Sequence, residues 1–169
     1  MIIREVNTSD AAQIAEIYNY YIASTAISFE EALVSVQEIA RRIETTTASG
    51  FPWVVALTDE QVVGYAYASH WKMRSAYRYS VESSVYLAYN ATGNGIGRAL
   101  YRELLTNLRT RGFSTVIGGI ALPNPASIGL HESLGFKKVG EFSNVGIKFG
   151  EKKSVGYWQL ELSENSFEF

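Results

Sequence analysis

The chain has 169 residues, of which 47% are hydrophobic and 19% charged, a composition that is typical of a globular domain and excludes disordered, collagen-like and coiled-coil proteins. Fifteen basic and seventeen acidic residues give a net charge of −2, which argues against a protein that binds long stretches of nucleic acid through its phosphates. Because cysteine is absent, disulfides, cysteine-rich metal sites and a thiol nucleophile are excluded.

The length fits one well-buried domain over residues 1–169. Met1 to Asp10 lacks the basic and apolar pattern of a signal peptide, and no apolar run approaches the ~18 residues that cross a bilayer. We therefore expect a cytoplasmic protein with no membrane or nucleic acid partner and no metal.

Apolar spacing and turn residues predict the elements in chain order. Runs of β-prone residues indicate strands over residues 2–6, 53–57, 62–67, 80–89, 113–120, 136–142 and 155–162. Helical spacing indicates helices over residues 14–21, 35–49, 96–108 and 128–134, and Ser35 and Glu38 fit a capping box at the start of the second helix. This order, β-α-α-β-β-β-α-β-α-β-β, predicts an α/β fold with one mixed sheet and helices on both faces.

A glycine-rich segment precedes the third predicted helix. Gly93, Gly95 and Gly97 lie within it, and Arg98 follows. Glycines reach positive φ and let a backbone approach a ligand, while a helix N-terminus attracts anions. The segment is therefore either a pyrophosphate site or a tight turn whose glycines serve geometry alone. A P-loop is excluded because its Gly-Lys-Ser/Thr is missing, and the Gly-x-Gly-x-Gly spacing fits a dinucleotide fingerprint poorly.

Three segments occur in a fixed order: the strand Val85-Tyr86-Leu87, the loop from Thr92 to Gly97, and the run from Asn124 to Phe136. Together they resemble the acetyl-CoA-binding core of the GNAT superfamily of N-acetyltransferases. Residues 71–77, 81–86 and 145–150 further resemble the phosphinothricin and methionine sulfone or sulfoximine N-acetyltransferases of that superfamily. The resemblance covers nearly the whole chain.

The resemblance implies a GNAT-like fold in which two parallel strands splay apart, with acetyl-CoA as the acyl donor between them. The open strand edges near 85–87 and 118–121 would bind pantetheine, and the loop would bind pyrophosphate. The family usually has Arg or Gln where this chain has Thr92, so we expect a lower CoA affinity. Asn124 lies between two prolines and is by itself a turn former; the resemblance gives it a hydrogen bond to CoA. The implied cofactor-binding residues are Val85, Tyr86, Leu87, Thr92, Gly93, Asn94, Gly95, Ile96, Gly97, Arg98, Asn124 and Ser133.

Acetyl transfer requires a neutral amine and a proton for the departing thiolate. Glu82 lies in an otherwise apolar strand, where burial raises the pKa of a carboxyl toward a range that suits a base, although an outward-facing glutamate is the alternative. The resemblance makes Glu82 the expected general base, acting directly or through water. It also makes His131 the expected acid for the thiolate, in place of the tyrosine of many members, although a structural histidine is the alternative. A backbone N–H of residues 85–87 is expected to meet the oxyanion.

Basic and aromatic residues alternate from Trp71 to Tyr79, with no acid among them. Such a loop can bind a carboxylate, because a guanidinium matches its geometry, although a solvated hairpin loop is the alternative. The resemblance implies that substrate is bound by Lys72, Arg74, Ser75, Ala76 and Tyr77, with Phe29, Glu30 and Lys148 as further candidates. It also implies a homodimer in which the region of Lys148 completes the site.

The sequence thus predicts an enzyme that transfers acetyl from acetyl-CoA to the α-amino group of a small amino acid, such as phosphinothricin, methionine sulfone or methionine sulfoximine. Acetylation of peptide N-termini or aminoglycosides is an alternative of the same fold, and an open or acidic groove would favour it. A non-catalytic acyl-CoA sensor is the other alternative. Such a sensor would tolerate the loss of Glu82.

Overall fold

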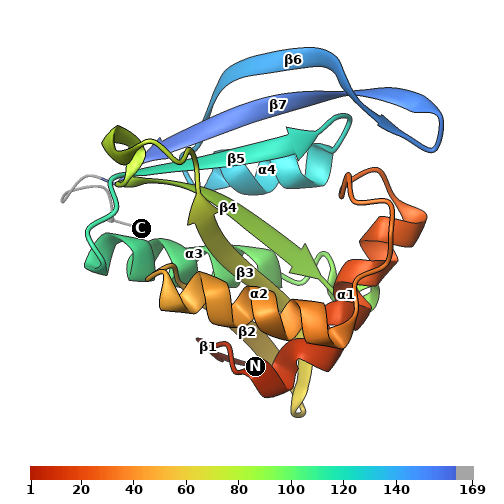
Figure 1. Ribbon diagram of the computed structural model, residues 1–169, viewed down its shortest axis with the longest axis vertical. Helices are drawn as coiled ribbons and strands as arrows, with labels where there is room; N and C mark the ends of the chain where they lie inside the picture. Colours follow the sequence, from red (N-terminus) through yellow and green to blue (C-terminus); the bar gives the residue numbers. More distant parts are fainter. Residues whose placement is uncertain (163–169) are drawn as a thin grey trace.

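One mixed sheet runs through the computed structural model, which describes residues 1–162 (Figure 1). Its seven strands lie in the order β1-β2-β3-β4-β5-β7-β6. They are β1 (Ile2–Glu5), β2 (Trp53–Thr58), β3 (Gln61–His70), β4 (Ser80–Leu87), β5 (Thr115–Ala121), β6 (Lys137–Lys148) and β7 (Glu151–Glu161). Within these residues β4 and β5 pair in parallel, and the other neighbours are antiparallel. The predicted mixed sheet is confirmed.

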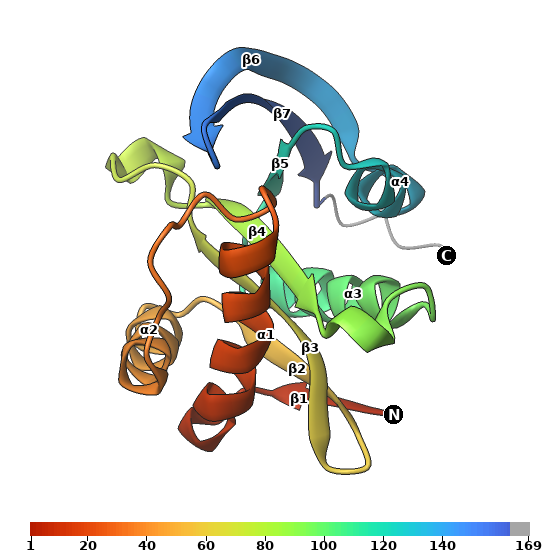
Figure 2. The same ribbon diagram turned by 90° about the vertical axis from the view of Figure 1, so that its right-hand side faces the viewer.

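Helices cover both faces of the sheet (Figure 2). On one face lie α1 (Ala11–Ser24) and α2 (Val36–Ala48), and on the other α3 (Ile96–Thr110) and α4 (Pro125–Ser133). Ser35 caps α2, since its hydroxyl accepts a hydrogen bond from the Glu38 amide at 3.1 Å. Among residues 1–162, no helix has both the length and the apolar character that crossing a membrane demands.

Each face of the sheet has its own core. The apolar stripe predicted on α3 is buried against β2, β3 and β4, and the side chains of Leu100, Leu104 and Leu108 are 0% exposed. On the opposite face, Ile14 of α1 and Ile39 of α2 belong to a second cluster that packs on β2 and β3. Burial on both faces makes the sheet a rigid support for groups at its edges.

The last two strands form a longer hairpin than the predicted 136–142 and 155–162. A two-residue turn joins them, and both of its residues have positive φ, 51° at Phe149 and 75° at Gly150. Such a turn matches the twist of a hairpin. The side chains of β6 are almost all exposed, so its extension lacks the alternation of buried and exposed residues that marks a strand in sequence.

The two parallel strands separate after a short pairing. β4 and β5 are in register from Ser80 to Glu82 on β4, opposite residues 115–117. Beyond that point β4 stays paired with β3 as far as Leu87, and β5 stays paired with β7 as far as Ala121. Figure 1 shows the two ribbons diverging. The splay opens the sheet in its middle.

Candidate active site

The splay exposes backbone groups along β4. The amide of Ala88 donates to the carbonyl of Val63 on β3 at 2.9 Å. Backbone groups alternate between the two edges of a strand, so those of Val85 and Leu87 face the splay. There the Leu87 carbonyl accepts a hydrogen bond from the Tyr21 hydroxyl at 2.7 Å. An extended ligand can bind this edge as a further strand would.

The predicted glycine loop connects β4 to α3 beside this edge. Gly93 has a φ of 79° and Gly95 a φ of 77°, and Gly95 immediately precedes α3. No side chain within the described residues caps this helix. Its first amides are therefore open to an anion, which the helix dipole also favours. The loop has the geometry of a phosphate site, with Arg98 on the first turn of α3.

A cavity of about 510 Å³, the loop cavity, lies between this loop, β4 and α4. It is lined by Tyr21, Ile27, Val85, Leu87, Thr92, Gly93, Gly95, Gly97, Arg98, Asn124, Ala126, Ser127, Gly129, Leu130 and Ser133. Of the predicted cofactor-binding residues, Tyr86, Asn94 and Ile96 lie outside this lining. Sequence reasoning missed Tyr21, because this residue comes from α1, far from the loop along the chain.

Asn124 begins α4. Its side-chain oxygen accepts a hydrogen bond from the Ser127 amide at 3.1 Å, so it caps the helix as a turn-forming residue would. The same residue lines the loop cavity. Asn124 can therefore act both as a turn former and as a cofactor-binding residue. Its hydrogen bond to a cofactor stays a prediction.

A small cavity of about 50 Å³, the linking cavity, lies in the splay itself. It shares Val85 and Ser127 with the loop cavity. It shares Tyr86, Gly119 and Ala121 with a third cavity on its other side. The three cavities therefore follow one another through the sheet.

The third cavity, the Glu82 cavity, has a volume of about 580 Å³. Its lining consists of Tyr18, Ile27, Ser28, Phe29, Glu30, Glu82, Tyr86, Gly119, Ala121, Val145, Val155 and Tyr157. Burial raises the pKa of the Glu82 carboxyl, and the nearby Lys72 ammonium opposes this shift. A desolvated carboxylate at the wall of a cavity is placed to take a proton from a bound molecule.

His131 is buried, and both of its ring nitrogens have partners. Nδ1 lies 2.7 Å from the Ser127 carbonyl, to which it donates, and Nε2 lies 2.9 Å from the Tyr101 hydroxyl. That hydroxyl is also 3.0 Å from the Ser83 hydroxyl. Burial lowers the pKa of His131. Because Tyr101 and His131 both line the linking cavity, the Tyr101 hydroxyl connects Nε2 to that cavity by a hydrogen bond. Sequence reasoning missed Tyr101.

Glu82 and His131 lie on opposite faces of β5. A methyl group built on Gly118 would be 2.5 Å from Nε2 of His131, and one built on Gly119 would be 3.2 Å from Oε1 of Glu82. Successive residues of a strand point to opposite faces. The two predicted catalytic residues thus approach the splay from its two sides.

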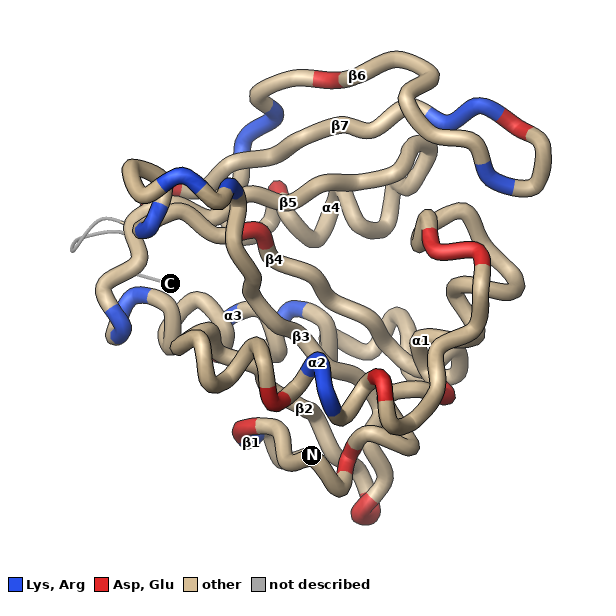
Figure 3. The backbone as a smooth tube through the Cα atoms, in the orientation of Figure 1, with Lys and Arg blue, Asp and Glu red and all other residues tan. Residues whose placement is uncertain are grey.

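The predicted substrate residues are not all brought to the Glu82 cavity. Phe29 and Glu30 line it, whereas Lys72, Arg74 and Tyr77 lie in the loop between β3 and β4, outside the lining, as do Ser75 and Ala76. This loop approaches the cavity where Trp71 contacts Tyr157 edge-on, with ring centroids 5.7 Å apart. Figure 3 shows its basic residues gathered at one end of the molecule.

Lys148 is buried rather than directed into the Glu82 cavity. Its ammonium donates to the carbonyls of Ser28 and Glu30. The Glu30 carboxylate in turn forms an ion pair with Arg42 of α2 at 2.7 Å. Together these contacts fix residues 28–30 as one wall of the Glu82 cavity, so Lys148 supports that wall from behind.

Residues 3–153 match the model of an acetyltransferase (GNAT) domain. The chain belongs to the GNAT acetyltransferase family. Like other GNAT enzymes, it uses acetyl-CoA as cosubstrate.

Several relatives of this GNAT enzyme are known. It is 35% identical to the L-methionine sulfoximine/L-methionine sulfone acetyltransferase of Salmonella typhimurium, over 98% of this chain and 97% of the relative. A crystal structure of a phosphinothricin acetyltransferase from Sinorhizobium meliloti in complex with acetyl-CoA is 39% identical, with a TM-score of 0.93 over 96% of this chain and 89% of the other. A crystal structure of a ribosomal-protein-alanine N-acetyltransferase from Brucella melitensis is 37% identical to this chain. Its TM-score is 0.93, over 95% of this chain and 99% of the other.

The residues of this GNAT enzyme fit the acetyl-CoA that the family uses. The open amides before α3 suit a diphosphate, and the free edge at Val85 and Leu87 suits the amides of a pantetheine arm. The linking cavity then lies where the arm would end. These features are observed in this structure itself. They support acetyl-CoA as the cosubstrate, as the family match does.

We expect Gly95→Ala to weaken acetyl-CoA binding by about tenfold, because a left-handed conformation costs an L-residue ~1–2 kcal/mol and the loop would relax away from its φ of 77°. Calorimetric titration measures the change. Gly50→Ala is the matched control, since Gly50 ends α2 with a φ of 84° and open space around it. The control should lose similar stability but keep its affinity. Equal affinity in both variants would contradict the phosphate role of the loop.

Proposed function

We propose that this GNAT enzyme acetylates the α-amino group of a small amino acid or amino acid analogue, such as phosphinothricin, methionine sulfone or methionine sulfoximine, in a direct transfer. The observation that carries the proposal is the Glu82 cavity at the end of the path through the sheet. Two carboxylates, Glu30 and Glu82, line it. Glu30 is already paired with Arg42, so Glu82 is the carboxylate that attracts an ammonium group. A molecule bound there meets the acyl donor through the splay.

Glu82 acts as the general base in this proposal. It takes a proton from the ammonium group of the acceptor, directly or through water, and leaves a neutral amine. Its raised pKa supports this role, because a carboxyl shifted upward is a better proton acceptor than an ordinary glutamate. The free N–H groups of Val85 and Leu87 are the donors for the oxyanion that forms during transfer.

His131 and Tyr101 act together as the acid. Acetyl-CoA supplies the acetyl group as a thioester, so a thiolate leaves. Tyr101 gives its hydroxyl proton to the sulfur and takes one from Nε2 of a protonated His131, so the sulfur gains the proton that His131 loses. The 2.9 Å contact between the two residues and their place in the linking cavity support this route.

From the loop between β3 and β4, outside the lining of the Glu82 cavity, Lys72 and Arg74 reach the carboxylate of the acceptor, and Tyr77 of the same loop contacts the acceptor. Lys72 already interacts electrostatically with Glu82. A cation and a carboxylate side by side complement the ammonium and carboxylate of an α-amino acid. A peptide presents its amine without an adjacent free carboxylate, and it would not use this pair.

A thiol-release assay with acetyl-CoA tests the proposal. The acceptors are phosphinothricin, methionine sulfone, methionine sulfoximine, a peptide with N-terminal alanine and an aminoglycoside. We expect turnover with the amino acid analogues and little with the others. Turnover of the peptide alone would favour N-terminal acetylation, for which the Brucella melitensis protein is named. Acetyl-CoA binding without turnover of any acceptor would favour a sensor.

We also propose that two copies associate through β6. This strand is the outer edge of the sheet, and Val145 and Ile147 on it are 61% and 62% exposed. We expect wild-type protein to sediment as a dimer and Ile147→Lys as a monomer, because a charge in an apolar interface is costly. Ile2→Lys is the matched control, since Ile2 is 67% exposed on β1 at the other edge. A monomeric wild type would contradict the dimer.

A further inference from the structure

A fourth cavity borders the Glu82 cavity at Tyr18. This side cavity has a volume of about 150 Å³ and lies between α2 and strands β2 and β3. Its lining is Tyr18, Ile39, Arg41, Arg42, Thr45, Thr46, Trp53, Tyr65 and Tyr67. Tyr18 lines both cavities. No step of the proposed reaction uses the side cavity.

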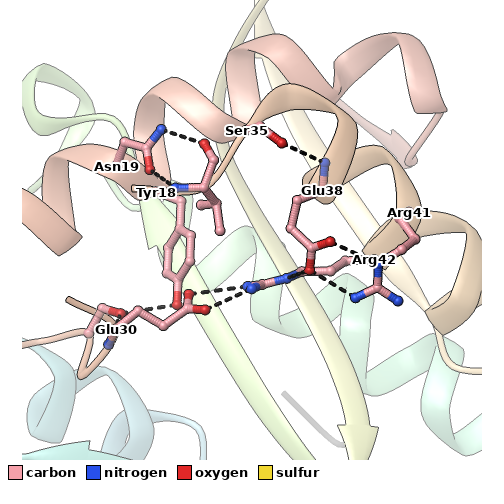
Figure 4. Close-up of polar contacts among 9 residues, drawn as sticks. Tyr18, Asn19, Glu30, Ser35, Glu38, Arg41 and Arg42 are labelled. Atoms are coloured by element: carbon pink, nitrogen blue, oxygen red, sulfur yellow. Dashed lines mark hydrogen bonds and ion pairs between the residues drawn. The ribbon is translucent and has the colours of Figure 1, made fainter. Parts of the chain in front are cut away.

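The Tyr18 ring and the ion pair between Glu30 and Arg42 lie where the two cavities meet, and Figure 4 shows the ring beside the ion pair. We call them the partition. The Tyr18 hydroxyl is 3.0 Å from the Ser28 hydroxyl, and its ring meets that of Tyr86 edge-on at 5.1 Å. Beside it, the Glu30 carboxylate, which lines the Glu82 cavity, accepts two hydrogen bonds from Arg42, which lines the side cavity, at 2.7 and 3.1 Å. The Tyr18 side chain is thus held at its hydroxyl by Ser28 and at its ring by Tyr86.

The groups of the partition do not change their protonation states near neutral pH. Burial, with the neighbouring Glu30 carboxylate, raises the pKa of Tyr18 to about 12, so its hydroxyl stays neutral. The Arg42 guanidinium lowers the pKa of Glu30, so the ion pair stays charged. A change of pH near neutrality is therefore not expected to alter the partition.

The chemistry of the side cavity suits a flat ring. The Trp53 ring stacks on that of Tyr67, with centroids 4.4 Å apart and planes at 20°, and on that of Tyr65 at 5.9 Å. Trp53 is 4% exposed, and its indole nitrogen is the buried side-chain polar atom that lacks a partner within residues 1–162. Aromatic walls favour stacked or edge-on rings. An aromatic amino acid side chain has the matching shape.

We infer that Tyr18 sets the size limit of the acceptor: it closes the Glu82 cavity against the side cavity, and a smaller residue at this position would join the two and admit aromatic amino acids. This inference rests on the proposed function, because it assigns the acceptor to the Glu82 cavity. A residue that lines two cavities and is held by the groups around it is a specificity determinant by geometry alone.

Three variants test the inference. Tyr18→Ala removes the ring, and Tyr18→Phe keeps the ring and removes only the hydroxyl. Tyr18→Ala/Thr46→Phe fills the side cavity from α2. The measured quantity is kcat/KM for phenylalanine divided by kcat/KM for methionine sulfone. We expect Tyr18→Ala to raise this ratio by about tenfold or more over wild type, the scale on which pocket size discriminates acceptors. Tyr18→Phe should keep the wild-type ratio, and the added Thr46→Phe should reverse most of the gain.

An unchanged ratio in a folded Tyr18→Ala protein would overturn the inference, as would an equal rise in Tyr18→Phe. Should Tyr18→Ala fail to fold, Tyr18→Leu replaces it with the same criteria. Failure of the proposed function looks different, because wild type would then acetylate no amino acid. In that case a crystal structure of Tyr18→Ala decides: a continuous cavity supports the inference, and a partition restored by neighbouring side chains contradicts it.

Discussion

Glu82→Gln is expected to lower kcat by about 10²- to 10⁴-fold, the range that a positioned general base contributes. Glutamine keeps the shape of the side chain but cannot accept the ammonium proton. Turnover is measured by thiol release, and acetyl-CoA binding by calorimetry should stay within about twofold of wild type, because Glu82 does not line the loop cavity. Glu38→Gln on α2, outside the described cavities, is the control.

The pH dependence provides a second measure of the same role. The pKa of Glu82 lies above its ordinary value of 4.5 because the carboxyl is buried, and only the deprotonated form accepts a proton. For wild type, kcat/KM should therefore rise as pH increases through this raised pKa. In Glu82→Gln this rise in kcat/KM should be absent. The rise that comes from deprotonation of the acceptor amine should remain. A Glu82→Gln enzyme with full turnover and the wild-type profile would exclude the base assignment.

Tyr101→Phe and His131→Ala should each lower kcat by about 10²-fold, the lower range for acid catalysis. Because the proposed proton path uses both residues in series, the double variant should be no slower than the slower single variant. A purely structural pair would instead lower the melting temperature while kcat of the folded enzyme stays unchanged. Fully additive losses would show that the two residues act independently.

Tyr65→Phe is the matched control for this series. Tyr65 is also a buried tyrosine, 2% exposed, but it lies on the side cavity and not on the linking cavity. Loss of its hydroxyl should leave kcat within about twofold of wild type. An equal loss in Tyr65→Phe would mean that any buried hydroxyl affects turnover, and the relay would then have no specific support.

Local patterns predicted most of the fold. The regular spacing of the leucines on α3 predicts the helix and its buried face. The glycines just before it predict the turn and the open N-terminus. Both patterns lie within a few adjacent residues, so they can be recognised from sequence alone. The full length of β6 could not be predicted from hydrophobic alternation, because both faces of an exposed strand can be polar. Its two-residue turn at Phe149 and Gly150 was the available signal.

The site was harder to predict where it depends on contacts between distant segments. Glu82 stood out as a charge in an apolar strand. Tyr101 did not, because on α3 it reads as one more residue of the apolar stripe, and its bond to His131 spans thirty residues. Lys148 was expected at the substrate, yet its ammonium meets carbonyls near residue 30, more than a hundred residues earlier. No local spacing encodes such pairings.

The opposite orientation of Gly118 and Gly119 bears on the kinetics of turnover. In the proposed reaction the donor binds in the loop cavity and the acceptor in the Glu82 cavity, on the two sides of the splay, so each can arrive or depart without displacing the other. The proposed direct transfer requires both molecules to be bound at once, so we expect intersecting rather than parallel double-reciprocal plots. A slow-leaving CoA would then hold back the next donor but not the next acceptor.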